Sequence, residues 1–295
     1  MKSCFECCVE AVSSESAKFK VNLVYLVPIL ASLIFGLGCA WLLSPHQNTN
    51  QNQVIPDIPI VPFPDNVTGA AANGLYIVAL VAVGATLCYL MLKRNNLKMI
   101  KVVISLVMTM ASMLLSLIYI STILTHFSVY NDLLVIVMSI LITVVFDLII
   151  FKFVKYRSAA IICVGGALGV FFSFLIPLYS TIAILVFLSI YDIFAVYRGP
   201  VGKIAQADLD QFPGLSYAFK DMQMGLGDLV FYAVLMGTMY FSFSSSILPA
   251  IMSLVGICIG AVMTFFMLEK KEIFPGLPFP IMLGLALGLI TTLFI

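Results

Sequence analysis

Nine long apolar runs constrain the fold of this chain more than any other feature of its sequence. The chain has 295 residues, of which 62% are hydrophobic and 10% are charged. Soluble domains carry about 25% charged residues, so too little polar surface is available here to cover a water-soluble globule. A membrane-spanning helix needs about 20 apolar residues. The predicted helices are Val21–Leu43, Gly74–Leu92, Val102–Thr125, Leu133–Phe151, Ala159–Ile176, Ser180–Tyr197, Leu226–Phe243, Ile247–Leu268 and Pro278–Ile295.

The positive charges test this count of helices. All fifteen Lys and Arg residues fall in segments that a nine-helix chain places on one side of the membrane. Because positively charged loops stay cytoplasmic, we expect the N-terminus inside and the C-terminus outside. These residues are Lys2, Lys18 and Lys20, then Lys93, Arg94, Lys98 and Lys101, then Lys152, Lys155 and Arg157, then Arg198, Lys203 and Lys220, and finally Lys270 and Lys271.

We therefore predict an all-α polytopic membrane protein with nine transmembrane helices in a single domain, residues 21–295. A cytoplasmic tail, residues 1–20, precedes the first helix, which we interpret as retained rather than as a cleaved signal peptide. Residues 199–224 form the longest predicted cytoplasmic connection between helices, and we expect it to be partly ordered at the membrane interface.

Small residues predict two close helix contacts, and an outer loop carries a modification motif. The pairs Gly165/Gly169 and Gly256/Gly260 have small-xxx-small spacing, which indicates close packing of helices. The predicted outer loop is proline-rich and ends in Asn66-Val67-Thr68, a glycosylation sequon.

The seven cysteines predict neither a disulfide framework nor a metal site. Cys4, Cys7 and Cys8 lie together near the start of the chain but lack a clear fourth ligand for zinc. Acylation is an alternative use for these thiols. We expect no metal and no other cofactor.

Three acidic residues fall inside predicted helices: Asp147, Asp192 and Asp228. An ionised side chain at bilayer depth costs at least ~2.5–3.5 kcal/mol on insertion scales, so such a residue needs a partner or a function. Asp147 lies five residues before Lys152. We interpret it as a carboxylate that snorkels to the interface or pairs with a basic residue.

Asp192 and Asp228 lie at similar predicted depths on consecutive antiparallel helices. Asp192 precedes Arg198 by six residues, about 9 Å along a helix, and Asp228 follows Lys220 by eight residues. If the helix starts at Gly225-Leu226-Gly227, Asp228 lies one to two turns inside the membrane. The two glycines leave room for a second backbone beside Asp228.

Two carboxylates a few ångströms apart cannot both ionise cheaply, which leaves one acid and one base. Such a pair can activate a water molecule and protonate a carbonyl oxygen or a leaving amine. This is the arrangement that aspartic proteases use, so Asp192 and Asp228 are candidate catalytic residues.

Three motifs, in order along the chain, resemble those of the presenilin and signal-peptide-peptidase family of GxGD intramembrane aspartyl proteases. They are Tyr191-Asp192 in the sixth helix, Gly225-Leu226-Gly227-Asp228 in the seventh, and a proline motif before the ninth. The family's proline motif is Pro-Ala-Leu, whereas this chain has Pro275-Gly276-Leu277-Pro278, with Gly in place of Ala. A register centred on Pro278–Pro280 also fits.

The resemblance implies an intramembrane aspartyl endopeptidase in which Asp192 and Asp228 form the catalytic dyad. Tyr191, Gly225, Leu226 and Gly227 would then shape the dyad and the path of the substrate. Pro275, Gly276, Leu277 and Pro278 would form a kinked entry that pairs with an unwound substrate as an added strand. The alternative interpretation of the prolines is an ordinary helix start.

The predicted orientation is that of presenilins, because signal peptide peptidases are similar but inverted. The short 199–224 loop puts self-cleavage in doubt and is more like that of compact homologues. The expected partners are transmembrane-helix substrates and membrane lipid, with no nucleic acid; accessory subunits are allowed but not implied. The resemblance predicts the plasma membrane of a prokaryote or an endomembrane, such as the endoplasmic reticulum, of a eukaryote.

Another class of function uses the same residues differently. A proton-coupled carrier or a cation leak channel would employ Asp147, Asp192 and Asp228 as a relay. Such a protein needs neither the Gly-x-Gly-Asp context nor the proline motif. A prepilin-type peptidase also has a GxGD motif, but its other motifs find no clear match here and it has fewer spans.

Overall fold

The computed structural model describes residues 23–44, 61–94, 97–197, 216–219, 222–243, 246–270 and 274–294. Within these residues nine α-helices occur, one for each predicted apolar run. A 3₁₀ turn, η1 (Leu23–Tyr25), precedes the first of them. The helices are α2 (Leu26–Leu43), α3 (Val67–Lys93), α4 (Leu97–His126), α5 (Asp132–Lys152), α6 (Val154–Leu175), α7 (Leu178–Tyr197), α9 (Leu226–Ser242), α10 (Leu248–Lys270) and α11 (Pro278–Thr292).

Two of these helices are shorter than the rest. Seven are long and apolar enough to cross a membrane, whereas α9 has 17 residues and α11 has 15. Both begin at the predicted residue, and in both cases non-helical backbone precedes the helix. Irregular backbone at membrane depth is tolerated where it is buried in protein or lines a wet cavity. The starts of α9 and α11 are therefore places to look for function.

A β-hairpin departs from the purely helical prediction. Strand β1 (Ser216–Phe219) pairs antiparallel with β2 (Met222–Gly225), and Phe219 is opposite Met222. This ordered hairpin occupies the end of the predicted 199–224 loop; residues 198–215 lie outside the described part of the chain. Strand β2 runs directly into α9. The sequence prediction that this connection is partly ordered is confirmed, but the order is a hairpin.

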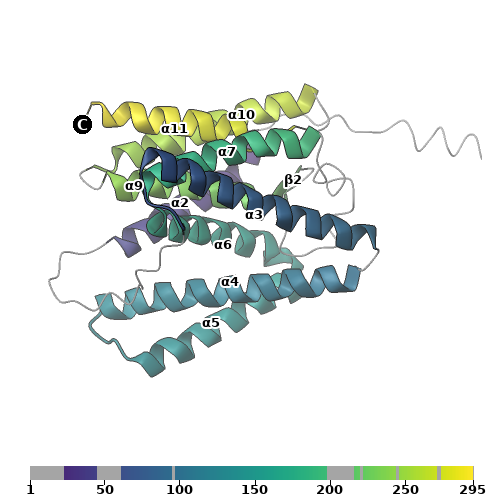
Figure 1. Cartoon of the computed structure of the whole chain (residues 1–295). Helices are drawn as coiled ribbons and strands as arrows, with labels where there is room; N and C mark the ends of the chain where they lie inside the picture. Colours follow the sequence, from purple (N-terminus) through teal and green to yellow (C-terminus); the bar gives the residue numbers. More distant parts are fainter. Residues whose placement is uncertain are drawn as a thin grey trace, which may run out of the picture.

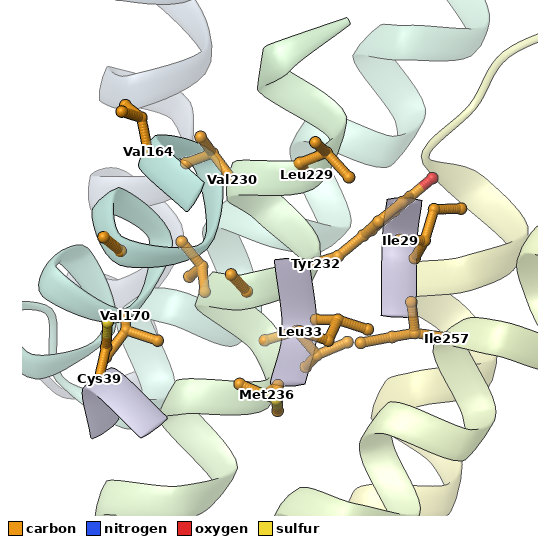
Figure 2. Close-up of a cluster of buried hydrophobic side chains, with 14 of the residues drawn as sticks. Ile29, Leu33, Cys39, Val164, Val170, Leu229, Val230, Tyr232, Met236 and Ile257 are labelled. Atoms are coloured by element: carbon orange, nitrogen blue, oxygen red, sulfur yellow. The ribbon is translucent and has the colours of Figure 1, made fainter. Parts of the chain in front are cut away.

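Helix α9 forms the centre of the molecule. Ten of its residues are buried. From Val230 to Met239 every residue except Phe231 is buried, so buried side chains lie on all sides of the helix. A helix that is apolar all round is buried all round. Figure 2 shows Leu229, Tyr232 and Met236 of α9 beside Ile29 and Leu33 of α2 and Ile257 of α10. The helix that carries Asp228 is therefore fixed by its neighbours.

The other helices pack around α9 in pairs. Helices α6 and α2 cover one part of it, α10 and α11 pack tightly on each other along another, and α7 also contacts α9. Helix α3 packs on α7 (Figure 1). Helices α4 and α5 pair with each other at the edge of the molecule farthest from α11 (Figure 1).

Both small-xxx-small pairs lie at close helix contacts, as predicted. A Cβ atom added at Gly169 would meet the carbonyl oxygen of Val230 and lie 2.5 Å from the Cβ of Ala233 on α9. One added at Gly256 would lie 2.5 Å from the carbonyl oxygen of Leu283 on α11. Larger residues at these positions would force the helices apart.

The end of the predicted outer loop is tied to two helices by buried polar groups. Asn73 on α3 donates to the carbonyl oxygen of Phe63 at 2.9 Å and accepts from the Phe63 N–H at 3.0 Å. The Asn73 amide also donates to the Ser180 hydroxyl at 2.9 Å. Asp65 accepts from the N–H and the hydroxyl of Ser180, at 2.8 and 2.7 Å, in the first turn of α7. These bonds fasten residues 63–65 between α3 and α7.

The sequon residue Asn66 lies at the start of α3. Its side-chain oxygen accepts from the Gly69 N–H at 2.7 Å and from the Thr68 hydroxyl at 3.0 Å. An amide oxygen in this position satisfies a helix N–H that has no intrahelical partner.

Candidate active site

Three elements bring the predicted site residues together. Asp192 lies on α7, five residues before its last residue, Tyr197. Asp228 lies in the first turn of α9. The proline motif precedes α11, and Pro278 stands at the start of that helix. Each element therefore contributes to the site from one of its ends.

The proline motif lies against both carboxyl groups. The N–H of Leu277 donates to Oδ2 of Asp192 at 3.0 Å. A Cβ added to Gly276 would lie 2.7 Å from Oδ2 of Asp228, so a glycine here allows the backbone to approach that carboxyl group closely. Consecutive residues of one short segment thus face the two acids.

The register of the proline motif follows from these contacts. Gly276 and Leu277 are the residues beside the carboxyl groups, and Pro275 is buried next to them. The alternative register falls inside α11, where Pro280 packs against Gly260 of α10. The rings of Phe274 and Phe279 stack on each other at 5.7 Å, on either side of the motif in the sequence.

Tyr232 holds the same segment from the other side, and the sequence prediction missed its role. Its hydroxyl donates to the carbonyl oxygen of Gly276 at 2.9 Å. Tyr232 lies one turn after Asp228 on α9, and its ring is fully buried. Figure 2 shows the side chain extending away from Leu33 towards the end of α9 that carries Leu229. Its position one turn after the aspartate was the only signal in the sequence.

Two backbone groups of the proline motif are bonded within the protein. In the structure the Leu277 N–H is bonded to Asp192 and the Gly276 carbonyl to Tyr232. Pro275 and Pro278 have no N–H to donate. The pairing of this motif with an unwound substrate stays a prediction.

The glycines of the GxGD motif have room on their Cβ side. Gly225 pairs with Ser216 of β1, and among the described residues the nearest atom to an added Cβ is 3.9 Å away at both Gly225 and Gly227. Gly225 is the last residue of β2, and Leu226 and Gly227 begin α9. The helix thus begins at Leu226, within the predicted Gly225-Leu226-Gly227 start, and the backbone before it is a strand. The close approach predicted beside Asp228 is made by Gly276 instead.

The remaining predicted residues have simpler positions. Tyr191 is partly buried on α7, directly before Asp192. Asp147 on α5 accepts from the Thr109 hydroxyl at 2.7 Å and from the Ser112 hydroxyl at 3.4 Å, both on α4. Its partners are hydroxyl groups rather than the basic residue that the sequence suggested. These contacts lie in the α4–α5 pair and do not connect Asp147 to the other two acids.

No group of three or more metal-binding side chains occurs in the part of the chain that the structure describes. The cysteine cluster Cys4, Cys7 and Cys8 lies outside that part.

Solved structures show the same fold, whereas comparisons of the sequence with family models and with curated proteins give no match. Two structures of a presenilin family intramembrane aspartate protease, solved in different space groups, superpose on this chain. The first has a TM-score of 0.64 at 17% sequence identity, and the match covers 92% of this chain and 99% of the chain in that structure. The second has a TM-score of 0.65 at 14% sequence identity, and the match covers 94% of this chain and 100% of the chain in that structure. The chain therefore has the polytopic membrane fold of these proteases, and the resemblance seen in the three motifs is confirmed for the fold.

Proposed function

We propose that this protein is an intramembrane aspartyl endopeptidase of the GxGD type, with Asp192 and Asp228 as its catalytic dyad. The observation that carries the proposal is the placement of Gly276 and Leu277 against both carboxyl groups. A proton relay has no need of a third segment that orients two acids at once. The shared fold with intramembrane aspartate proteases supports the same conclusion.

The proposed reaction is the hydrolysis of a peptide bond by water. The ionised carboxylate of the dyad removes a proton from water, whose oxygen attacks the carbonyl carbon of the substrate. The other carboxyl group donates its proton to the carbonyl oxygen. Proton return to the nitrogen then allows the C–N bond to break, and the dyad regains its single shared proton. No metal or cofactor enters these steps.

We propose that the substrate is the transmembrane helix of another membrane protein, unwound near the dyad. An unwound backbone in lipid needs hydrogen-bond partners. Strand β2 supplies them, because in a two-stranded sheet one of its edges pairs with β1 and the other is left for a third strand. Among the described residues, no atom lies closer than 3.9 Å to a Cβ added at Gly225 or Gly227, which leaves room for that strand just before Asp228.

We further propose nine membrane spans with a cytoplasmic N-terminus, from the placement of all fifteen Lys and Arg residues. The short helices α9 and α11 complete their spans with β2 and with the proline motif, whose irregular backbone is enclosed by protein.

The test uses purified protein in detergent and a synthetic transmembrane peptide, with fragments identified by mass spectrometry. The wild-type chain is expected to cut the peptide. Asp192→Asn and Asp228→Asn should each lower the rate by at least ~10²-fold, since each removes an acid–base group. Asp147→Asn is the matched control, because it removes an intramembrane carboxyl group outside the proposed dyad, and it should retain cleavage. Cleavage that survives Asp228→Asn, or that is lost equally in Asp147→Asn, contradicts the proposal.

A further inference from the structure

A cleft on the outside of the α4–α5 pair is not used by the proposed protease mechanism. It has a volume of about 520 Å³ and is lined by residues from Lys101 to Met110 of α4, starting about one turn after the helix begins, with Phe151 of α5 at one side. Ligand sites typically measure about 300–1,000 Å³, so the cleft is large enough for part of a lipid. Its polar lining residues are Lys101, Ser105 and Thr109, and its apolar ones include Val102 and Met110.

The polar residues of this cleft form one stripe along α4. Lys101, Ser105 and Thr109 are four residues apart, a spacing that places side chains on the same face of a helix. The stripe extends about 12 Å along the helix axis, from its basic end to Thr109. The cleft therefore runs from the membrane interface, where Lys101 lies near the start of α4, into the hydrocarbon region.

The two ends of the cleft differ in charge. Lys101 lies at one end, with Lys98 one turn before it on α4 and Lys152 directly after Phe151 on α5. At the other end the Thr109 hydroxyl donates to Asp147 at 2.7 Å, so its proton is already used. The donors left to bind an anion are thus Lys101 and Ser105, at the interfacial end.

We propose that this cleft binds an anionic phospholipid. The phosphate lies at Lys101 with Ser105 below it, and an acyl chain lies on Val102, Met110 and Phe151. Charge complementarity supports this occupant, because basic pockets between transmembrane helices on the cytoplasmic side attract anionic head groups. A zwitterionic lipid would gain only the apolar contacts. At the deep end the carboxyl group of Asp147 already accepts from Thr109 and offers no cation to a phosphate, which favours the orientation with the head group at Lys101.

The test measures lipid retention by native mass spectrometry of the purified full-length chain. The probes are dioleoyl phosphatidylglycerol and dioleoyl phosphatidylcholine, titrated separately into detergent. The wild-type chain should retain one phosphatidylglycerol at concentrations at which phosphatidylcholine is lost. Glycerol 3-phosphate, a head group without acyl chains, should not displace the bound lipid at equal concentration. Displacement by it would show a phosphate site and overturn the assignment to a phospholipid.

Two variants and a matched control locate the lipid. Lys101→Gln should weaken phosphatidylglycerol binding about fivefold, the effect of one basic residue near an anionic lipid. Met110→Trp keeps the charge but fills the apolar part of the cleft, and it should also weaken binding. Lys155→Gln is the control, since Lys155 is an exposed basic residue on α6 that does not line the cleft. It should bind as the wild type does.

Four results would overturn the proposal. Equal losses in Lys101→Gln and Lys155→Gln would indicate attraction to the basic surface in general. Unchanged phosphatidylglycerol binding in Lys101→Gln would show that the head group does not lie at Lys101. Unchanged binding in Met110→Trp would show that the lipid does not occupy this cleft. Equal retention of the two lipids by the wild-type chain would contradict anionic selectivity. Circular dichroism of each variant confirms its helix content before binding is compared. None of these readouts depends on proteolysis, so this proposal stands or falls separately from the proposed function.

Discussion

Single backbone contacts determine the chemistry available at this site. Gly276 and Leu277 lie against Asp228 and Asp192, and the Tyr232 hydroxyl fixes the carbonyl group between them. Each contact joins residues from different elements, so small changes in one side chain alter the geometry of both acids. The same contacts leave the glycines of the GxGD motif open on one side.

Tyr232→Phe removes the hydroxyl that bonds to Gly276 while keeping the buried ring. A neutral hydrogen bond contributes about 0.5–1.5 kcal/mol net, so we expect the cleavage rate to fall by up to about tenfold. The fall should appear in kcat rather than in KM, because the bond positions the dyad and does not touch the substrate. Tyr240→Phe, farther along α9, is the control. Equal kinetics for the wild type and Tyr232→Phe would contradict a positioning role.

Gly225→Val tests the proposed substrate edge. Among the described residues no atom lies closer than 3.9 Å to the added Cβ, so helix content and the unfolding temperature should stay at wild-type values. The side chain would occupy the open space where we place the unwound substrate, and KM is expected to rise several-fold. Unchanged peptide kinetics in a folded variant would place the substrate elsewhere.

Helix packing depends on positions where no side chain fits. Helix α6 reaches the central helix α9 through Gly169, and α10 reaches α11 through Gly256 and Gly260. Because lipid is as apolar as the helices, close van der Waals contact rather than the hydrophobic effect holds such pairs together. The two short helices, α9 and α11, gain their stability from this enclosure.

Gly169→Ala should destabilise the protein. The added methyl would meet the Val230 carbonyl oxygen and the Cβ of Ala233, both on a central helix that cannot move freely. Overpacking of this kind costs about 1–3 kcal/mol, which should lower the thermal unfolding midpoint in detergent. Gly84→Ala on α3 is the matched control, since an added Cβ has nothing within 4 Å. An equal shift in both variants would show that helix propensity, not the contact, decides the effect.

Asn73→Ala should release the segment that joins the outer loop to α3. Three hydrogen bonds of the Asn73 side chain are lost, and leaving their partners unsatisfied costs about 1–3 kcal/mol. Hydrogen exchange of the Phe63 amide should become faster than in the wild type. Thr86→Ala, on the exposed part of α3, should leave that exchange unchanged. If the Phe63 amide exchanges as slowly in Asn73→Ala as in the wild type, the hydrogen bonds of Asp65 alone are sufficient to hold the segment.

The whole molecule is organised around a central helix whose first turn carries Asp228 of the candidate site. Helices α4 and α5 form a pair at one edge of the molecule (Figure 1). The pair therefore offers a lipid-facing cleft that is separate from the dyad. In the predicted topology all the Lys and Arg residues lie on the same side of the membrane.

That topology predicts which residues react with a membrane-impermeant thiol reagent. In a variant whose native cysteines are replaced, Ser128→Cys, between α4 and α5, should be labelled from outside intact cells or right-side-out vesicles. Lys155→Cys, at the start of α6, should react only after the membrane is permeabilised. Labelling of Lys155→Cys in sealed preparations would invert the orientation and reject the assignment based on positive charges.

The sequence alone was enough to predict the nine helices and to single out Asp192 and Asp228, because the length of an apolar run and a charge within it are both visible locally along the chain. It also indicated the glycine contacts, since small-residue spacing is visible along one helix. It did not reveal the hairpin of β1 and β2, the bonds of Tyr232 and Leu277, or the hydroxyl partners of Asp147. Those depend on which helix faces which, and pairs far apart in the sequence are brought together only when the helices pack.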